Sequence, residues 1–429
     1  MAFFGLLCAG IALAGIFENL VHARRLRAIP VRIHVNGTRG KSTTTRLIAA
    51  GLRAGGRRVI AKTTGTAASI IWEDGSEEPL RRERRLGGHA QGQGPASTAC
   101  AQGSGREGRG RGRGRASIAE QMRVAALAAR RGVDALVLEC MALDPENQWV
   151  SEHKMIRSTI GVITNVRDDH LDVMGPRLRD AARALSLTIP RRGVLVTAER
   201  AFAGVLEERA RAVGASVHVV DGSAVPDEVN EAFPYVSFKE NVACALKACE
   251  LAGVPRDVAI SGMLAARGDP GVMRILSIKR ARASYILVNA FAANDSTSTS
   301  LIWSLVRESL VEKGALRDSP SGVPIAVVMN NRADRVPRIR ELALLVAREI
   351  RPLKVFLVGE AARFAKAQLA RNGVALDCVT DLTALREPEA VLDAIGASLP
   401  GGAVLFAIGN TKGMGQRLAE FFQRNGEVL

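Results

Sequence analysis

A glycine-rich segment near the N-terminus contains the residues of a phosphate-binding loop. It consists of Gly37, Thr38, Arg39, Gly40, Lys41, Ser42 and Thr43. Glycines let backbone N–H groups turn toward phosphate oxygens, and the start of the following helix adds a favourable field. A full Walker motif has another glycine five residues before Gly40, where this chain has Val35. The shortened loop still predicts an ATP site, in which Lys41 contacts the β- and γ-phosphates and Ser42 binds Mg²⁺.

Two more side chains with metal-binding chemistry follow predicted strands. Glu139 lies at the end of the apolar run 134–140, and His170 lies in the segment NVRDDHLD, after the run TIGVIT. The carboxyl ends of parallel strands share the edge of the sheet where ligands bind. A glutamate or a histidine at such a position is, taken alone, more often structural. The order of phosphate loop, strand-end glutamate and Asp-Asp-His instead favours a second divalent cation, held by Glu139 and His170 beside the γ-phosphate.

The elements that position these residues follow an α/β pattern. A strand at 31–35 precedes the phosphate loop, and a helix at 43–54 follows it. Apolar runs alternate with helical stretches, which predicts parallel sheets covered on both faces. The first series of runs spans 134–140, 159–166, 193–198 and 215–220, and the second spans 284–291, 324–330, 354–360 and 403–409. We place a domain boundary at about residues 266–274, which gives a central domain at 30–268 and a second at 269–429.

The N-terminus resembles a membrane anchor. Residues 1–17 are almost all apolar or small, and Arg24, Arg25 and Arg27 follow closely. About 20 residues cross a bilayer, so we expect an anchor helix at 1–21. The arginines favour a cytoplasmic location for the rest of the chain. A cleaved signal peptide would have positive charge before the apolar run, which is missing here. The alternative is a buried N-terminal helix.

The net charge of +16 indicates anionic partners, and much of it is local. Residues 80–115 contain nine arginines and two glutamates, and this Gly- and Arg-rich stretch lacks apolar periodicity. We therefore expect a disordered insertion at about 83–115. An RNA-binding role of this stretch is the alternative, and nucleic acid is not the partner we expect. The six cysteines form no CxxC pair, which predicts neither a zinc site nor a disulfide framework.

The ordered motifs resemble those of the Mur ligases, a superfamily of ATP-dependent amide ligases that includes folylpolyglutamate synthase. GTRGKST matches their phosphate loop, and NVRDDHLDVMG resembles their DH-containing segment. The resemblance implies that Glu139 and His170 are Mg²⁺ ligands. It also implies nucleotide contacts by three later residues: Asn241 in ENVA, Arg274 in DPGVMR and Asp295 in FAANDSTSTS. The implied fold is a central P-loop ATPase domain with a parallel sheet, then a C-terminal Rossmann-like α/β domain.

Within the superfamily, the segments KTTGTAA, LECMAL, DPGVMRI and NNRADRV look like those of poly-γ-glutamate synthases. The resemblance implies γ-glutamyl amide ligation through an acyl phosphate, with release of ADP and phosphate. The implied partners are glutamate, the growing poly-γ-glutamate chain, membrane lipid and other membrane subunits of the synthase. Arg332 and Asp334 are candidates for gripping the glutamyl substrate, and Lys62 and Thr64 are weaker ones.

Two departures from the superfamily pattern matter. The stretch LRDAARALSLTIP contains no lysine, although many Mur ligases carry a modified lysine after the DH segment. A UDP-substrate domain is also missing, which argues against a cell-wall precursor as substrate. The alternatives are a nucleotide switch or kinase that shares only the phosphate loop, and a folylpolyglutamate-type ligase acting on another substrate.

Overall fold

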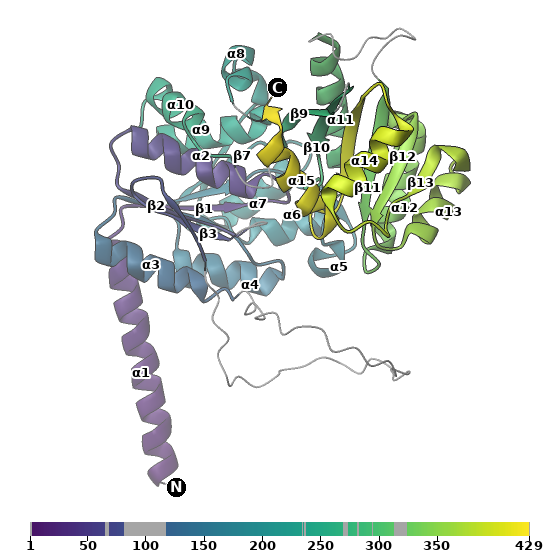
Figure 1. The fold of residues 1–429 in the computed structure, drawn as a ribbon. Coiled ribbons are helices and arrows are strands. Elements are labelled where there is room, and N and C mark those ends of the chain that lie inside the picture. Colours follow the sequence, from purple (N-terminus) through teal and green to yellow (C-terminus); the bar gives the residue numbers. More distant parts are fainter. Residues whose placement is uncertain are drawn as a thin grey trace.

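The computed structural model describes residues 2–64, 68–80, 117–233, 235, 237–268, 273–280, 283–293, 295–312 and 324–428. The insertion predicted at 83–115 lies outside this part of the chain. Residues 269–272, within the predicted domain boundary, lie outside it as well, so the domain bounds stay a prediction. The described strands form two sheets, of eight and seven strands (Figure 1).

The first sheet carries the phosphate loop. Its strands, in spatial order, are β4 (Glu77–Pro79), β3 (Ser69–Ile71), β2 (Val59–Thr63), β5 (Ala135–Glu139), β1 (Val31–Asn36), β6 (Ile160–Ile163), β7 (Val194–Thr197) and β8 (Ser216–Val219). The six strands from β2 to β8 are parallel, as the alternation of strands and helices predicts. Only β3 and β4 are added antiparallel, at the edge. Strand β1, with the loop at its end, therefore lies between β5 and β6.

Helices cover both faces of this sheet, as expected. The helices of this half are α2 (Lys41–Ala54), α3 (Glu120–Arg131), α4 (Pro145–Val150), α5 (Leu171–Met174), α6 (Leu178–Ser186), α7 (Ala203–Val213), α8 (Asp227–Glu231), α9 (Lys239–Leu251) and α10 (Arg256–Leu264), and a π-helical turn, η1 (Ser151–Ile156), continues α4. One core packs α2, α9 and α10 against the sheet. A second core packs α3 against the opposite face, with side chains such as Val124 and Leu136.

The second sheet is also mainly parallel. Its order is β13 (Val379–Asp381), β12 (Lys354–Gly359), β11 (Ile325–Asn331), β14 (Ala403–Gly409), β10 (Ala283–Asn289), β9 (Ile275–Arg280) and β15 (Glu427–Val428). Helices α11 (Ser296–Glu312), α12 (Val336–Leu345) and α13 (Ala362–Arg371) cover one face, and α14 (Pro388–Ser398) and α15 (Met414–Asn425) cover the other. Strands β9 and β15 are antiparallel to their neighbours and were not predicted, since neither has the long apolar run of a central strand.

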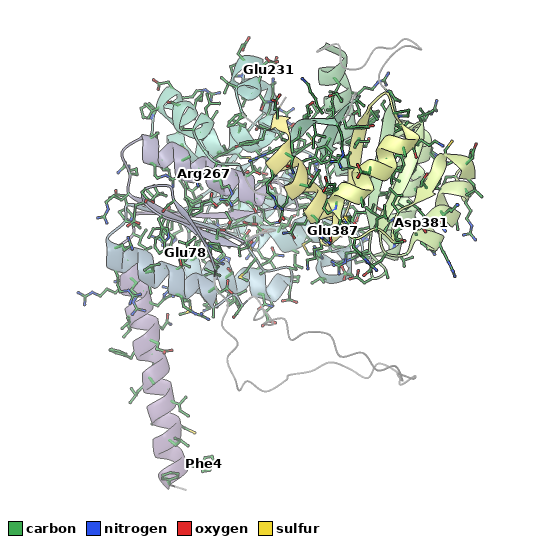
Figure 2. All side chains as sticks on the ribbon, in the orientation of Figure 1. Phe4, Glu78, Glu231, Arg267, Asp381 and Glu387 are labelled. Carbon is green, nitrogen blue, oxygen red and sulfur yellow. The ribbon has the colours of Figure 1, made fainter. Side chains whose placement is uncertain are left out.

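Helix α1 (Ala2–Arg27) projects away from both sheets (Figure 1). Its segment Leu7–Arg27 is long and apolar enough to cross a membrane, and little of that segment is buried. Large apolar side chains such as Phe4 and Phe17 are exposed along it, and Figure 2 shows Phe4 near its free end. This exposure disagrees with the alternative of a buried N-terminal helix.

Only the last turns of α1 join the fold. Leu26, and Ile29 just beyond the helix, are buried in the core that contains α3. His22 Nε2 lies 2.7 Å from Met155 O, and Arg32 Nη1 donates to Leu26 O at 3.0 Å and to Ile29 O at 2.6 Å. Because an arginine satisfies these terminal carbonyls, the helix ends in a fixed position on the domain.

Candidate active site

The phosphate loop joins β1 to α2, as the sequence predicts. Gly37 and Gly40 adopt φ angles of 126° and 81°, a region that side chains disfavour. A Cβ at Gly40 would also lie 2.4 Å from Asn241 Oδ1, and one at Gly37 would lie 2.1 Å from Thr164 Oγ1. Both positions therefore require glycine. The helix begins at Lys41, two residues earlier than predicted.

Lys41 folds back over this loop. Its Nζ donates to Gly37 O at 2.6 Å and to Thr38 O at 3.1 Å. Desolvation lowers the pKa of Lys41, although Glu139 nearby opposes the shift. Burial disfavours the charged ammonium of Lys41 unless an anion lies close to it. A bound phosphate group would supply that anion.

Glu139 and Ser42 come together, as the predicted metal set requires. Ser42 Oγ donates to Glu139 Oε2 at 2.9 Å, and the backbone N of Thr64 donates to the same oxygen at 2.6 Å. A carboxylate and a hydroxyl are oxygen ligands of the kind that hard divalent cations prefer. The described residues contain no group of three His, Cys, Asp or Glu side chains arranged to hold a metal. Phosphate oxygens and water would therefore have to complete the coordination.

His170 follows β6 and begins α5, with a φ of 52°. Its Nε2 lies 3.6 Å from Asp169 Oδ1. Burial lowers the pKa of His170 despite Asp169, which favours the neutral imidazole that a metal ligand needs. Glu139 ends β5 and His170 lies beyond β6, and these two strands flank β1. No contact between them is found among the described residues, and their shared metal site stays a prediction.

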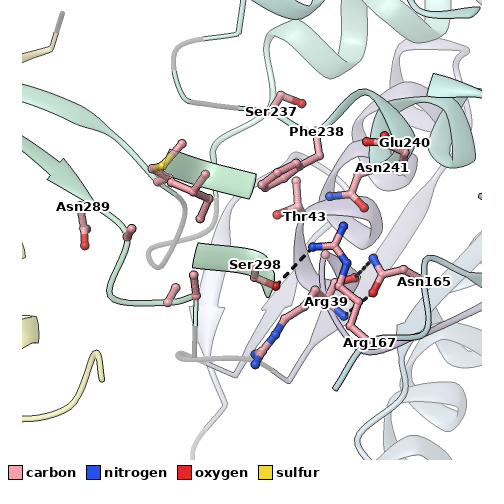
Figure 3. A pocket seen from close by; sticks show the side chains of 16 residues that line it. Arg39, Thr43, Asn165, Arg167, Ser237, Phe238, Glu240, Asn241, Asn289 and Ser298 are labelled. Carbon is pink, nitrogen blue, oxygen red and sulfur yellow. Dashed lines mark hydrogen bonds between the residues drawn. The ribbon is translucent and has the colours of Figure 1, made fainter. Parts of the chain in front are cut away.

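A pocket next to the loop is lined by residues from both halves of the chain (Figure 3). Arg39, Gly40, Thr43 and Asn241 line it from the first half of the chain, and residues such as Asn289 and Ser298 line it from the second. Asn241 therefore lines the pocket beside Gly40, and its adenine contact stays a prediction. Phe238 also lines the pocket and was not predicted from the sequence. It immediately precedes α9 and packs against the core of the second sheet. Its position three residues before Asn241 could have indicated that it lies near the same site.

Arg274 and Asp295 both belong to the second half of the chain, Arg274 just before β9 and Asp295 just before α11. Arg274 follows the segment 269–272, and its buried Nε lacks a hydrogen-bond partner within the described structure. Such an orphaned donor suits an external acceptor. Asp295 Oδ2 instead accepts from Arg39 Nε at 2.9 Å, and its Oδ1 accepts from the backbone N of Ser298 at 2.7 Å. The predicted nucleotide contact of Asp295 would have to share that carboxylate with Arg39.

The predicted substrate residues fall into two separate environments. Arg332 and Asp334 follow β11 and pair through two hydrogen bonds, Nε to Oδ1 at 2.9 Å and Nη2 to Oδ2 at 2.7 Å. Lys62 is fully buried in β2, with Nζ 3.4 Å from Glu120 Oε2. This geometry is typical of a structural ion pair. Thr64 supplies a backbone N–H to Glu139.

Comparison with solved structures first defines the class of fold. A bifunctional folylpolyglutamate synthase/dihydrofolate synthase from Yersinia pestis, complexed with AMPPNP and Mn ion, has a TM-score of 0.61 at 14% identity, over 95% of this chain and 92% of that one. A Mycobacterium tuberculosis folylpolyglutamate synthase, complexed with ADP and AMPPCP, also has a TM-score of 0.61, at 15% identity over 94% and 93%. The chain therefore has the two-domain fold of the Mur ligases and folylpolyglutamate synthases.

Comparison of sequences then identifies the family. A family described as poly-gamma-glutamate synthase CapB C-terminal domain matches residues 275–425. PGA synthase CapB of Bacillus subtilis is 33% identical over 96% of this chain and 95% of that protein. The capsule biosynthesis protein CapB of Bacillus anthracis is 37% identical over 81% of this chain and 67% of that protein. The chain belongs to the CapB family of poly-γ-glutamate synthases.

Proposed function

We propose that the chain is an ATP-dependent ligase that joins glutamates through their side-chain carboxylates in poly-γ-glutamate synthesis. One observation supports this most directly. The phosphate loop after β1 lies between Glu139, at the end of β5, and His170, after β6. In this arrangement an ammonium, a carboxylate and an imidazole would act on one phosphate group. The similarity to PGA synthase CapB, which covers nearly the whole chain, also supports this function.

In the first step, a glutamate side-chain carboxylate attacks the γ-phosphorus of ATP, and ADP leaves. Lys41 reduces the negative charge on the phosphoryl oxygens as the new P–O bond forms. Ser42, Glu139 and His170 would hold Mg²⁺, which would draw further charge from these oxygens. The product is an acyl phosphate.

In the second step, the amine of another glutamate attacks the acyl carbon, and inorganic phosphate leaves with the electrons of the C–O bond. The amine loses one proton as the amide forms. Arg332 and Asp334 are our candidates for holding the glutamyl substrate, because they follow the carboxyl end of β11. A pocket lined by both halves of the chain favours exclusion of water, which would otherwise hydrolyse the acyl phosphate.

We further propose that α1 anchors the chain in the cell membrane, with both sheets on the cytoplasmic side. The exposed apolar side chains of α1 and the arginines at its base support this orientation. Other membrane subunits of the synthase are the partners that we propose for export of the polymer.

The test uses membranes that contain the full-length chain, labelled glutamate, ATP and Mg²⁺, with the Lys41→Ala variant as the matched control. ADP and phosphate should form in step with γ-linked amide bonds in the wild type and not in the variant. Hydroxylamine should trap a hydroxamate only when glutamate and ATP are both present. Release of AMP would contradict the phosphoryl-transfer step, and a polymer linked through α-carboxylates would contradict the substrate assignment.

A further inference from the structure

The segment that contains α12 and α13 is strongly basic. Residues 332–371 include ten Arg and Lys side chains and four Asp and Glu side chains, a large share of the net charge of the chain. Helices α12 and α13 pack side by side over β11 and β12 (Figure 1). Both helices begin at the carboxyl edge of the sheet, because each follows one of these parallel strands.

Each of the four acidic side chains of this segment already has a hydrogen-bond partner. Asp334 is held by Arg332, and Glu360 Oε2 accepts from the backbone N of Ala333 at 2.9 Å. Glu341 and Glu349 accept from serine hydroxyls of α11, Ser296 and Ser300 respectively. Helix α12 lies between α11 and α13, since the strands that these helices connect follow that order. Glu341 of α12, and Glu349 in the turn that follows α12, therefore point toward α11, away from α13.

Basic side chains occupy the other side of α12. The guanidinium of Arg340 lies 5.7 Å from the ring centre of Phe364 on α13, and the exposed Arg363 is the neighbour of that phenylalanine. Neither arginine has a carboxylate partner among the described residues. Arg335, at the start of α12, has only Asp334 near it, with a nitrogen–oxygen distance of 3.9 Å. We call Arg335, Arg340 and Arg363 the basic face.

The basic face adjoins the candidate active site. Arg338, in the first turn of α12, places Nη2 3.3 Å from Asp169 Oδ1, next to His170. The arginines of the basic face therefore lie at the start of α12, on α12 and on α13, next to the segment that carries His170.

We propose that the basic face binds the growing poly-γ-glutamate chain through its α-carboxylates, outside the site of phosphoryl transfer. This inference rests on the proposed function, since γ-linkage leaves one free α-carboxylate on every residue of the polymer. A repeating polyanion matches arginines on neighbouring helices, of which Arg340 and Arg363 have no carboxylate partner among the described residues.

The test compares the full-length double variant Arg340→Gln/Arg363→Gln with the wild type, both in detergent. The control is Arg211→Gln/Arg424→Gln, which removes two exposed charges from α7 and α15. Binding of fluorescent poly-γ-glutamate is measured by anisotropy at several salt concentrations. The basic-face variant should bind the polymer roughly three- to tenfold more weakly at low salt, as expected for two solvent-screened charge contacts, and the control should not. Its KM for a long polymeric substrate should rise by a similar factor, whereas its KM for ATP should not change.

Each other outcome has a distinct meaning. Equal polymer binding by the basic-face variant and the wild type would overturn the inference. So would an equal loss in the control, or equal competition by an RNA oligomer of the same charge, because either would show non-specific polyanion binding. Polymer binding is measured without turnover. A wild type that binds polymer at the basic face but never releases ADP with glutamate would contradict the proposed function alone.

Discussion

Arg39 Nε lies 2.9 Å from Asp295 Oδ2, and this contact joins the phosphate loop directly to the second sheet's half of the chain. Asp295 also caps α11 through the backbone N of Ser298. Arg39 Nη2 lies 3.4 Å from Asp169 Oδ2 as well, so one guanidinium connects Asp295 to the segment that carries His170. A movement of either half would therefore shift the loop that is predicted to hold the phosphates.

This contact predicts strong coupling between Arg39 and Asp295. Arg39→Ala and Asp295→Asn should each weaken ATP binding, and their effects should be non-additive by roughly 0.5–3 kcal/mol, as found for residues in direct contact. Asparagine retains the oxygen that caps α11, so Asp295→Asn should leave the melting temperature nearly unchanged. A double-mutant cycle on ATP affinity checks this, and strictly additive effects would show that the pair is not coupled.

The predicted metal ligands should affect turnover more than nucleotide affinity. Glu139→Ala and His170→Ala should reduce kcat about 10²- to 10³-fold, the size observed when one group that stabilises transition-state charge is removed. Lys41→Ala should reduce both kcat and ATP affinity, since Lys41 would contact the phosphates in the ground state as well. Single-turnover ADP formation and nucleotide binding are measured on each variant. Wild-type turnover in the His170 variant would contradict its assignment as a metal ligand.

A buried ion pair beneath the loop predicts a pH dependence of stability. His34 Nδ1 in β1 lies 2.9 Å from Glu152 Oε2 in η1. Burial opposes the charge of His34, but the adjacent Cys140 and Glu152 outweigh it and raise its pKa to about 9. Because the folded pKa exceeds the unfolded value of about 6.5, the stabilisation is complete below pH 6.5 and is lost as the pH rises through 9.

The free energy of unfolding should therefore fall by on the order of 3 kcal/mol from this group between pH 6 and pH 10. His34→Gln should flatten that slope, because the titrating group is removed. Urea unfolding at a series of pH values measures the difference between the two proteins. Parallel curves for the wild type and the variant would show that His34 does not carry the dependence.

Two truncations should separate anchoring from folding. Removing residues 1–20 should release the protein from membranes and leave ATP binding intact, since His22, Leu26 and Ile29 remain. Removing residues 1–29 should also destabilise the domain by several kcal/mol, because each buried aliphatic side chain contributes about 2–5 kcal/mol. Membrane fractionation and urea unfolding provide the two measurements. A shorter truncation that still sediments with membranes would contradict the anchor.

The sequence predicts those parts of the fold that short-range pattern determines. Buried parallel strands such as β14 are continuous apolar runs, so their positions agree closely with the structure. The phosphate loop is local too, and its glycines mark the required turn. The pairing of Arg39 with Asp295, 256 residues apart, could not be predicted, because it depends on how two separately packed sheets meet. The same holds for Lys62, whose burial against Glu120 is set by the placement of α3.

The way α1 joins the domain has a mechanical consequence. Three residues, 28–30, separate the helix from β1, and Arg32 binds the last carbonyls of α1. The helix is thus a rigid extension of the domain and not a flexible linker. In a bilayer it would leave the enzyme free to diffuse in the plane but would prevent tumbling, so the catalytic edge would keep one height and one tilt. Each newly added residue would then start its path toward export from the same distance above the lipid.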